Sequence, residues 1–589
     1  MTPRPRDVAR VLLPALLAAC GLARAQSQAD SAGERFKALY SAEYSWRLTQ
    51  DPPYEDRPKG LPLKLPDVSA ANQAAKLARW TDVERQLQAI TPGDLGAEDR
   101  VNYAVYRQQI ESLLAGQRFR DFQKPLNADS SFWGDLAELA REPLRTEEDY
   151  REYLALLRDI PRYFDQQAVN MRAGSARHFT PPAATLAGRD AGVAQIATAA
   201  TPADVIFYKP FNEFPGTFPA ALQESLRAQG AAAIREAVIP AYAKLLKFLR
   251  DEYLPHARTT LAAYALPDGK AYYRSKIREF VTVDLPPEEI HAIGLAEVAK
   301  IRARMLEVMR EVDFKGDLPA FLTHLRTDPR FYATTPQELL NRAAWIAKTF
   351  DGKAAQWFGR LPRSRFAIRP VPVELAPFYT GGRGGPGIYL VNTYNLKARP
   401  LFSQIALTLH ESAPGHAFQM PLAAENQDLP EFRRNGYLSA YGEGWALYSE
   451  ALGEEMGMYE TPYDRFGMLS YQMWRAARLV VDTGVHSQNW TRAQAQQYLH
   501  DNTAMADHEI ETEVDRYIAW PGQALSYYMG LIAIQKARAR AEAALGVKFN
   551  IRAFHDAVLA LGGVPLPVID ARVDQLIAEN GKGPYPNEE

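Results

Sequence analysis

The strongest constraint on the fold of this chain lies in residues 408–450, which hold a His-Glu pair, a second histidine six residues after the first, and a further glutamate. The segment begins TLHESAPGHAFQM and, after a mixed stretch, continues as SAYGEGWALYSE. Its chemistry-bearing residues are His410, His416 and Glu443, with Glu411 directly after the first histidine. Two imidazoles and a carboxylate are the ligand set of a catalytic zinc that keeps one position open for water. The adjacent glutamate is placed to act as the general base for that water.

The spacing of the two histidines departs from the usual zinc-peptidase pattern. In H-E-x-x-H the histidines are four residues apart on one helix and therefore share a face. Here His416 follows His410 by six residues, and six steps on a regular helix amount to a rotation of roughly 240°. Pro414 and Gly415 fall inside the interval and can kink or bulge the helix, which would return the second histidine to the side of the first. The alternative is an ordinary helix end with capped histidines, because Pro-Gly commonly marks a turn.

Composition and charge limit the classes of protein to which this chain can belong. The chain has 589 residues, of which 47% are apolar and 23% charged, as in an ordinary soluble globular protein, and its length suggests several domains. A formal net charge of −2 gives no reason to expect nucleic acid or an anionic membrane surface as a partner. Cys20 is the only cysteine, so we expect no intramolecular disulfide, no thiol nucleophile in the mature domain and no cysteine-rich zinc site.

Residues 1–25 are predicted to be a secretory leader. Three arginines precede the apolar run VLLPALLAA, which is too short for a transmembrane helix. Two cleavage sites compete. LAAC at residues 17–20 resembles a lipobox, which would leave Cys20 lipidated, whereas ARA at residues 23–25 before Gln26 fits ordinary signal peptidase. Either site predicts an exported, periplasmic protein, attached to the membrane only if Cys20 carries a lipid anchor.

The chain after the leader divides into two predicted regions. Residues 26–285 are predicted to form an N-terminal helical region, because segments such as AANQAAKLARWTDVERQLQAI place apolar residues at three- and four-residue intervals. Within it, residues 173–219 are rich in Ala, Thr, Pro and Gly, and we expect a long surface excursion there. Residues 286–589 form the second region, which carries the histidines and the glutamate.

A small β-sheet is predicted just before the first histidine. Residues 366–396 read FAIRPVPVELAPFYTGGRGGPGIYLVNTYNL, in which FAI, VPV and IYLV are predicted strands joined by Pro- and Gly-containing turns. An edge strand of such a sheet could hold an extended peptide by main-chain hydrogen bonds. The alternative is a sheet that only supports the fold.

The motifs HESAPGH and EGWALYSE resemble those of the bacterial domain of unknown function 885 family. The resemblance covers most of the chain after about Leu285 and includes TVDLPPEEIHAIGLAEVAKIRARM, APFYTGG, IYLVNTYN, ARLVVDTGVHSQNWTRAQA and EVDRYIAWPGQALSYYMG. That family is similar to zinc metallopeptidases of the HExxH type with a glutamate ligand. Carboxypeptidase Taq and the thimet oligopeptidase group are distant relatives.

The resemblance implies both a fold and a site. The implied fold is mainly α, an elongated multi-helix zinc-peptidase-like structure with a central cleft and a small sheet beside the metal helix. The implied ligands of Zn²⁺ are His410, His416 and Glu443, and Glu411 matches the position of the base. Residues 286–589 would then be the metallopeptidase-like catalytic region.

Several residues around the metal are candidates for supporting roles. Glu450 lies seven residues after Glu443 and so shares its helix face, where it could orient a histidine ligand or remain a solvated surface glutamate. His486, Tyr517 and Tyr527 are candidate donors to the oxyanion that amide hydrolysis develops, because they fall in segments matching the family. Any one of them could equally be structural.

Three further residues are predicted to contact the substrate. Arg478 and Arg516 could grip a peptide carboxylate through a bidentate contact. Asn392, in the IYLVNTYN segment, is the third candidate.

These patterns predict an exported zinc metallopeptidase that hydrolyses peptides through a metal-activated water and Glu411, without a covalent intermediate. Hydrolysis of a non-peptide amide is the alternative among enzymes. A catalytically silent peptide-binding envelope lipoprotein is the alternative outside them, although a binder has no need of the base. The oligomeric state stays open.

Overall fold

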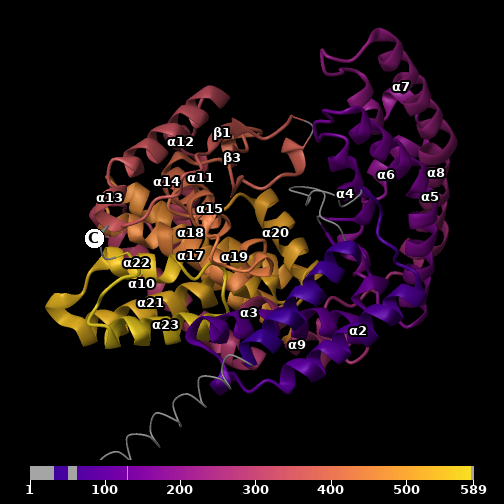
Figure 1. Cartoon of the computed structure of the whole chain (residues 1–589). Helices are drawn as coiled ribbons and strands as arrows, with labels where there is room; N and C mark the ends of the chain where they lie inside the picture. Colours follow the sequence, from indigo (N-terminus) through magenta and orange to yellow (C-terminus); the bar gives the residue numbers. More distant parts are fainter. Residues whose placement is uncertain (1–31, 51–62, 129, 374, 586–589) are drawn as a thin grey trace, which may run out of the picture. The chain divides into compact units, whose positions relative to one another are not determined.

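The described part of the chain is mainly helical. The computed structural model describes residues 32–50, 63–128, 130–373 and 375–585 (Figure 1). They fall into two compact units, the first ending at Arg118 and the second beginning at Phe119. The predicted mainly α fold with one small sheet is confirmed. None of the helices described is both long and apolar enough to cross a membrane.

Two sequence predictions stay predictions at this level. The leader and both of its cleavage sites lie outside the described residues. The boundary near residue 285 between a helical and a catalytic region likewise stays a prediction.

The first unit is organised around a buried glutamate. Glu43, which is fully buried, accepts hydrogen bonds from Trp80 Nε1 at 2.9 Å and from the Tyr106 hydroxyl at 3.1 Å. These contacts satisfy a carboxylate that would otherwise be costly to bury. The helices involved are residues 32–50, α2 (Ala70–Gln88) and α3 (Ala97–Phe119).

The second unit begins with helices that surround aromatic residues. A capping box of Thr146 and Asp149 starts the longest of them, α5. The expected surface excursion at residues 173–219 is wrong in part, because short helices form there and bury Phe207 and Phe211. The α-helices of this part are α4 (Phe132–Leu139), α5 (Glu147–Ala176), α6 (Ala191–Ala197), α7 (Ala220–Ala233), α8 (Ile239–Phe248) and α9 (Gly269–Val281).

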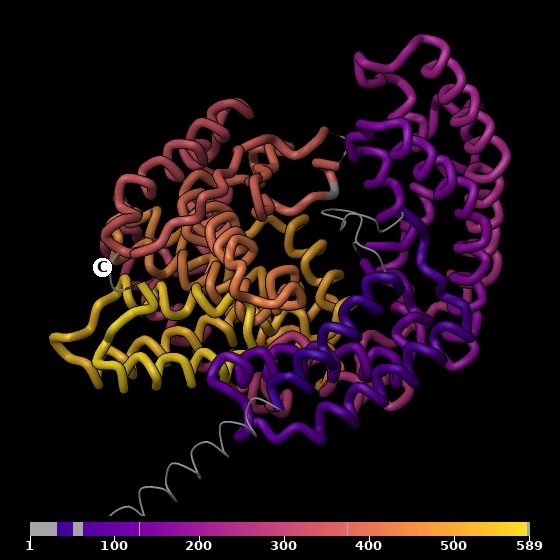
Figure 2. The backbone as a smooth tube through the Cα atoms, in the orientation of Figure 1, coloured from indigo at the N-terminus to yellow at the C-terminus, as the bar shows by residue number. Residues whose placement is uncertain are grey.

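A long helix, α18, forms the centre of the remaining part. Nearly every residue from Phe466 to His486 is buried, because α10, α14, α17, α19, α20 and α21 all pack against it. The orange segments of the tube in Figure 2, which include α14, α17 and α18, show this central packing. The α-helices are α10 (Pro287–Glu311), α11 (Leu318–Thr327), α12 (Pro336–Asp351), α13 (Ala354–Trp357), α14 (Gln404–Glu411), α15 (His416–Glu425), α16 (Glu431–Arg434), α17 (Ser439–Glu455), α18 (Pro462–Gln488), α19 (Arg492–Asn502), α20 (Asp507–Ala519), α21 (Ser526–Leu545), α22 (Ile551–Leu559) and α23 (Leu566–Ala578).

The small sheet has three strands in the order β1-β3-β2. Strand β1 (Ala367–Pro370) pairs parallel to β3 (Ile388–Val391), and β2 (Gly382–Gly385) pairs antiparallel to β3. The predicted strands FAI and IYLV correspond to β1 and β3. The predicted strand VPV is wrong, because residues 371–373 form no strand: the Val371 N–H still donates to the Val391 carbonyl at 3.0 Å, but Pro372 has no N–H to donate. The glycine-rich segment GRGG takes the third place in the sheet, as an edge strand beside α14 and α15.

Helices α17 and α21 cross at two glycines. A Cβ on Gly530 would lie 2.0 Å from the Ala440 carbonyl oxygen, and one on Gly444 would lie 2.5 Å from the Gly530 Cα. Only residues without a side chain allow this approach. The hydroxyls of Ser439 and Ser526 meet at 2.7 Å beside the crossing. The crossing brings the first turns of the two helices together, and those turns carry Glu443 and Tyr527.

Candidate metal centre

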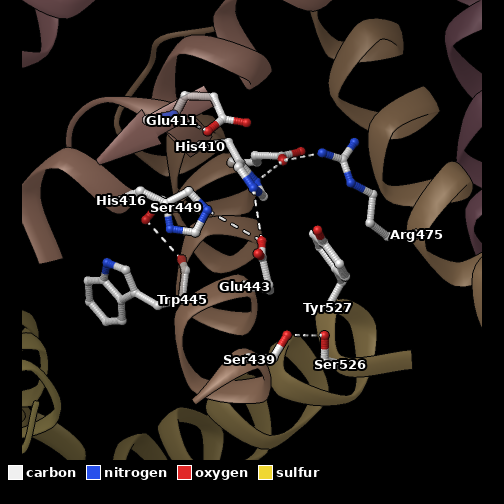
Figure 3. Close-up of polar contacts among 12 residues, drawn as sticks. His410, Glu411, His416, Ser439, Glu443, Trp445, Ser449, Arg475, Ser526 and Tyr527 are labelled. Atoms are coloured by element: carbon white, nitrogen blue, oxygen red, sulfur yellow. Dashed lines mark hydrogen bonds and ion pairs between the residues drawn. The ribbon is translucent and has the colours of Figure 1, made fainter. Parts of the chain in front are cut away.

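His410, His416 and Glu443 converge on one point (Figure 3). Each offers a ligand atom, and these atoms all lie within 4.8 Å of one another. Glu443 Oε2 lies 3.4 Å from His410 Nε2 and 3.3 Å from His416 Nε2. Ligand atoms at 2.0–2.1 Å from a tetrahedral zinc are roughly 3.3–3.4 Å apart. The donor set and its spacing therefore fit a divalent cation such as zinc.

An interruption of the helix brings the two histidines together. Helix α14 ends at Glu411 and α15 begins at His416, so the intervening residues 412–415 make a tight turn. The Gly415 N–H donates to the Leu409 carbonyl at 3.0 Å, and a Cβ on Gly415 would lie 1.8 Å from the His410 carbonyl oxygen. The two imidazole rings consequently meet at 4.9 Å between centroids. This is the kinked arrangement predicted from Pro-Gly, in the form of a complete break between two helices.

Two other side chains hold the first histidine and the turn in place. Glu450, fully buried on α17, lies 2.7 Å from His410 Nδ1, which turns Nε2 toward Glu443. Trp445, also on α17, donates its indole N–H to the Pro414 carbonyl at 2.8 Å. Helix α17 thus supplies Glu443, which is a candidate ligand, the hydrogen-bond partner of His410 and the support for the turn.

The electrostatics of the cluster favour positive charge at its centre. Burial alone would lower the pKa of His410, but its hydrogen bonds to the carboxylates of Glu443 and Glu450 raise it to about 10. Burial alone would raise the pKa of Glu443, but His416 and His410 hold it well below its usual range. A buried carboxylate held ionised between two imidazoles is arranged to bind a cation.

Glu411 lies at the edge of the cluster, against strand β2. Its Oε2 accepts a hydrogen bond from the Gly384 N–H at 2.6 Å. A Cβ on Gly384 would lie 1.6 Å from the Glu411 carbonyl oxygen, so only glycine allows the strand to pass this close. The N–H of Gly384 therefore fixes the carboxylate beside His410, where it can act as a base toward a molecule bound at the cluster.

Tyr527 and Tyr437 flank the cluster. The ring of Tyr527 stacks on His410, with centroids 6.4 Å apart and planes 16° apart, and its hydroxyl accepts from Arg516 at 3.2 Å. The Tyr437 hydroxyl donates to Glu443 Oε1 at 2.9 Å, while its side chain is half-exposed. Sequence reasoning missed Tyr437, because nothing in its neighbourhood marks it apart from a position six residues before Glu443.

Two of the predicted site residues are engaged elsewhere. The Ala263 N–H donates to Nδ1 of His486 at 3.1 Å and Nε2 donates to the Tyr517 carbonyl at 2.9 Å, so neither ring nitrogen is left for an oxyanion. Asn392 is fully buried and its amide nitrogen donates to three main-chain carbonyls of the loop at residues 376–380. This arrangement gives both residues structural roles, in place of the predicted contacts with an oxyanion and with substrate.

The remaining three predicted residues belong to one buried network. Tyr517 accepts hydrogen bonds from Arg478 Nε at 2.9 Å and from the indole of Trp474 at 2.8 Å. Arg478 donates to Glu513 at 2.9 Å, and Arg516 lies 3.6 Å from the same carboxylate. The network reaches the cluster because the Arg478 guanidinium lies over the Tyr527 ring, at 4.3 Å from its centroid. In this arrangement Arg478 and Arg516 support Tyr527, and their guanidinium groups are engaged within the protein rather than offered to a substrate carboxylate.

Comparison with known protein families identifies the chain's relatives. The family described as bacterial protein of unknown function (DUF885) matches residues 58–573. The chain belongs to this family. No match was found among curated proteins.

Two solved structures are similar to this chain over most of its length. A crystal structure of a candidate lipoprotein from Colwellia psychrerythraea is 28% identical, with a TM-score of 0.84 over 94% of this chain and 99% of that chain. A candidate lipoprotein of unknown function from Shewanella oneidensis is 17% identical, with a TM-score of 0.66 over 92% of this chain and 99% of that chain, and shares the fold. An M32 carboxypeptidase from Deinococcus radiodurans R1 is 12% identical with a TM-score of 0.28 over 86% of this chain and 98% of that chain, a similarity too low to bear on function.

Proposed function

We propose that this DUF885 chain is an exported zinc-dependent metallopeptidase with Glu411 as its general base. The observation that supports the proposal most is the convergence of His410, His416 and Glu443, whose carboxylate lies 3.4 and 3.3 Å from the two imidazole nitrogens, with Glu411 fixed at the edge of the cluster. A binding protein would need neither the metal geometry nor the adjacent carboxylate.

The three ligand residues would hold the cation, with Glu450 orienting His410 from behind. A bound zinc would polarise the scissile carbonyl and lower the pKa of the attacking water. Glu411 would accept the proton of that water and return it to the leaving amine, since its carboxylate already lies beside the cluster. No covalent intermediate is needed.

Tyr527 is the candidate donor to the developing oxyanion. Its hydroxyl accepts a hydrogen bond from Arg516, so its own hydrogen is available to donate to a second group. The cationic Arg516 also polarises this hydroxyl, which makes it a stronger donor. Tyr437 would position Glu443 from the exposed side of the cluster.

Strand β2 is the candidate binding edge for the peptide main chain. It is one of the two edge strands of the sheet, and Gly384 within it contacts Glu411. An extended peptide adding to this edge would pass the base and the cluster.

Metal analysis and peptide hydrolysis test this proposal together. Purified protein is expected to carry one zinc per chain and to cleave peptides in a mixed set. Chelation should abolish cleavage, and added zinc should restore it. Protein that holds zinc and peptides without cleaving them would favour the peptide-binding alternative, and cleavage that survives complete metal removal would overturn the proposal.

Export is part of the proposal. It is supported by the leader-like sequence at residues 1–25 and by two similar solved structures that are described as candidate lipoproteins. Mass spectrometry of the protein from its native cells should give a mature chain that begins at a lipidated Cys20 or near Gln26. An intact Met1 in the cytoplasm would contradict export.

A further inference from the structure

Arg383 lies one residue from the contact between strand β2 and the proposed base. The N–H of Gly384 donates to Glu411 Oε2 at 2.6 Å, so this N–H points away from β3, to the free edge of β2. Consecutive Cα atoms are about 3.8 Å apart. The backbone of Arg383 is therefore held close to the place where Glu411 could act on a substrate.

The side chain of Arg383 leaves the sheet on the face opposite helix α14. A Cβ on Gly384 would lie 1.6 Å from the Glu411 carbonyl oxygen, so the side-chain direction of Gly384 points toward α14. Successive residues of a strand point to opposite faces, and Arg383 consequently projects from the other face. The arginine is exposed there, so a ligand can reach its guanidinium from solvent.

Arg383 has no ion pair with a carboxylate among the residues that the structure describes. Burial raises the pKa of the Tyr379 hydroxyl, the adjacent Arg383 guanidinium lowers it, and the charge of Glu411 raises it. Tyr379 thus lies within electrostatic range of both the arginine and the proposed base. Glu138 of α4 also acts on Tyr379, but this carboxylate pairs with Arg141 at 2.6 Å.

A second exposed arginine stands on the same face of the sheet. Arg369 of β1 and Arg383 of β2 both pair with Leu390 of β3, so the three residues form one row across the sheet. Neighbouring strands are about 4.8 Å apart, which separates the Cα atoms of the two arginines by roughly 10 Å. Two exposed cations give this face a positive potential, which attracts anionic groups.

A peptide added to the free edge of β2 would bring its own groups to Arg383. Residues opposite each other on neighbouring strands lie about 4.5–5.5 Å apart, so the substrate residue opposite Arg383 would be next to the one opposite Gly384. The guanidinium fork matches a carboxylate through two parallel hydrogen bonds. Arg478 and Arg516, which the sequence suggested for this contact, are engaged within the protein.

We infer that Arg383 binds a carboxylate of the substrate, at the C-terminus of a peptide or on an acidic side chain, within one or two residues of the cleaved bond. The inference rests on the proposed peptidase function, because it takes Glu411 as the reacting centre and β2 as the edge that holds the peptide.

Binding to the full chain after chelation tests this contact without cleavage and without coordination of the carboxylate by a metal. Three N-acetylated tetrapeptides serve as probes. The first has a free C-terminus and neutral side chains, the second an amidated C-terminus and one glutamate, and the third an amidated C-terminus and glutamine in place of the glutamate.

Calorimetry should show the first peptide, the second or both binding at least about fivefold more tightly than the third. An advantage of the first peptide identifies the carboxylate as the chain end, and an advantage of the second identifies it as an acidic side chain. Equal binding of all three peptides would overturn the inference.

Substitutions locate the carboxylate on the sheet. Arg383→Gln should abolish the preference, and Arg383→Lys should keep part of it, since lysine retains the charge but not the fork. Arg369→Gln is the matched control, because it removes an exposed arginine from the same row at the other edge of the sheet, and it should preserve the preference. A preference that survives in Arg383→Gln, or that Arg369→Gln reduces equally, would contradict the assignment.

Kinetics with zinc bound separate substrate binding from a general effect on the sheet. Arg383→Gln should raise KM at least about fivefold for the peptides with the preferred carboxylate, with kcat within about threefold and the uncharged peptide unchanged. A fall in kcat that is the same for all three peptides would give Arg383 a structural role and overturn the inference.

The outcomes distinguish the two proposals. A carboxylate preference that depends on Arg383, in a chain that hydrolyses no peptide with zinc bound, would refute the peptidase and leave Arg383 as part of a peptide-binding site. Hydrolysis without any carboxylate preference, unchanged in Arg383→Gln, would refute the assignment of Arg383 alone.

Discussion

Tyr527 connects the metal centre to the buried arginine network. Its ring stacks on His410 and its hydroxyl accepts from Arg516. Tyr527→Phe should keep the metal and the fold but reduce kcat by roughly a hundredfold to a thousandfold, the effect of removing one oxyanion donor. Tyr528→Phe is the matched control, since the neighbouring hydroxyl on the same helix donates to Glu297. Similar kcat values for the two variants would remove Tyr527 from the chemistry.

His486 has a structural role that titration can reveal. Because Nδ1 accepts and Nε2 donates within the protein, the imidazole is held neutral, and burial lowers its pKa to about 3. In the unfolded chain its pKa is about 6.5. Between those values the unfolded state binds the proton and the folded state does not, so this group makes the fold less stable as pH falls below 6.5.

We therefore predict a pH-dependent effect of His486→Gln. From pH 7 to pH 5 the wild type should lose roughly 2 kcal/mol that the variant does not lose. The neighbouring Asp482, whose pKa burial raises to about 7, opposes this trend in both proteins and cancels in the difference. Denaturant unfolding at the two pH values measures it. If wild type and His486→Gln differ in unfolding free energy by the same amount at pH 7 and at pH 5, that result would contradict a neutral, buried His486.

Single residues were predictable where local spacing decides their position. His410, His416 and Glu443 could be singled out because residue type and order already resemble a ligand set. The roles of His486 and Asn392 could not be predicted, because the hydrogen-bond partners of both side chains are main-chain atoms. For His486, one of these partners belongs to Ala263, which is far away in the sequence. Chain spacing carries no information about such contacts.

At the scale of elements, the break between α14 and α15 is the feature that brings His410 and His416 together in the candidate metal centre. Gly415→Ala would push a methyl group into the His410 carbonyl, 1.8 Å away. We expect the variant to lose about 1–3 kcal/mol of unfolding free energy and to bind zinc at least tenfold more weakly. Calorimetry with zinc titration measures both.

Gly192→Ala provides the control for that variant. A Cβ at Gly192 on α6 meets nothing within 4 Å, so stability and zinc affinity should stay close to those of the wild type. If Gly415→Ala behaves in the same way, the helix break does not depend on glycine.

The sheet shows why elements are harder to predict than the helix break. Pro414 and Gly415 predict an interruption of the helix, because their backbone properties disfavour a continuous helix. The segment GRGG has little intrinsic preference for a strand, and it becomes β2 because the absence of side chains lets it lie between β3 and Glu411. That reason exists only in the folded molecule.

For the molecule as a whole, helical periodicity and the alternating runs at residues 366–396 were enough to predict a mainly α protein with a small sheet just before His410. The short helices within residues 173–219 were not predicted, because helices that bury single aromatic side chains such as Phe207 show no periodic pattern in the sequence. The central position of α18 has a different physical basis: buried residues lie all round the helix, and polar ones among them, such as Arg478 and His486, find their partners inside the protein.

The measurement that tests the central claim most directly is peptide hydrolysis by Glu411→Gln. The glutamine oxygen can still accept from the Gly384 N–H, so fold and bound zinc should be retained, as thermal unfolding and metal analysis would verify. Without the proton acceptor, hydrolysis should fall on the order of a hundredfold to ten-thousandfold. A variant that holds zinc and cleaves peptides at the wild-type rate would contradict the assignment of Glu411 as the base and, with it, the proposed mechanism.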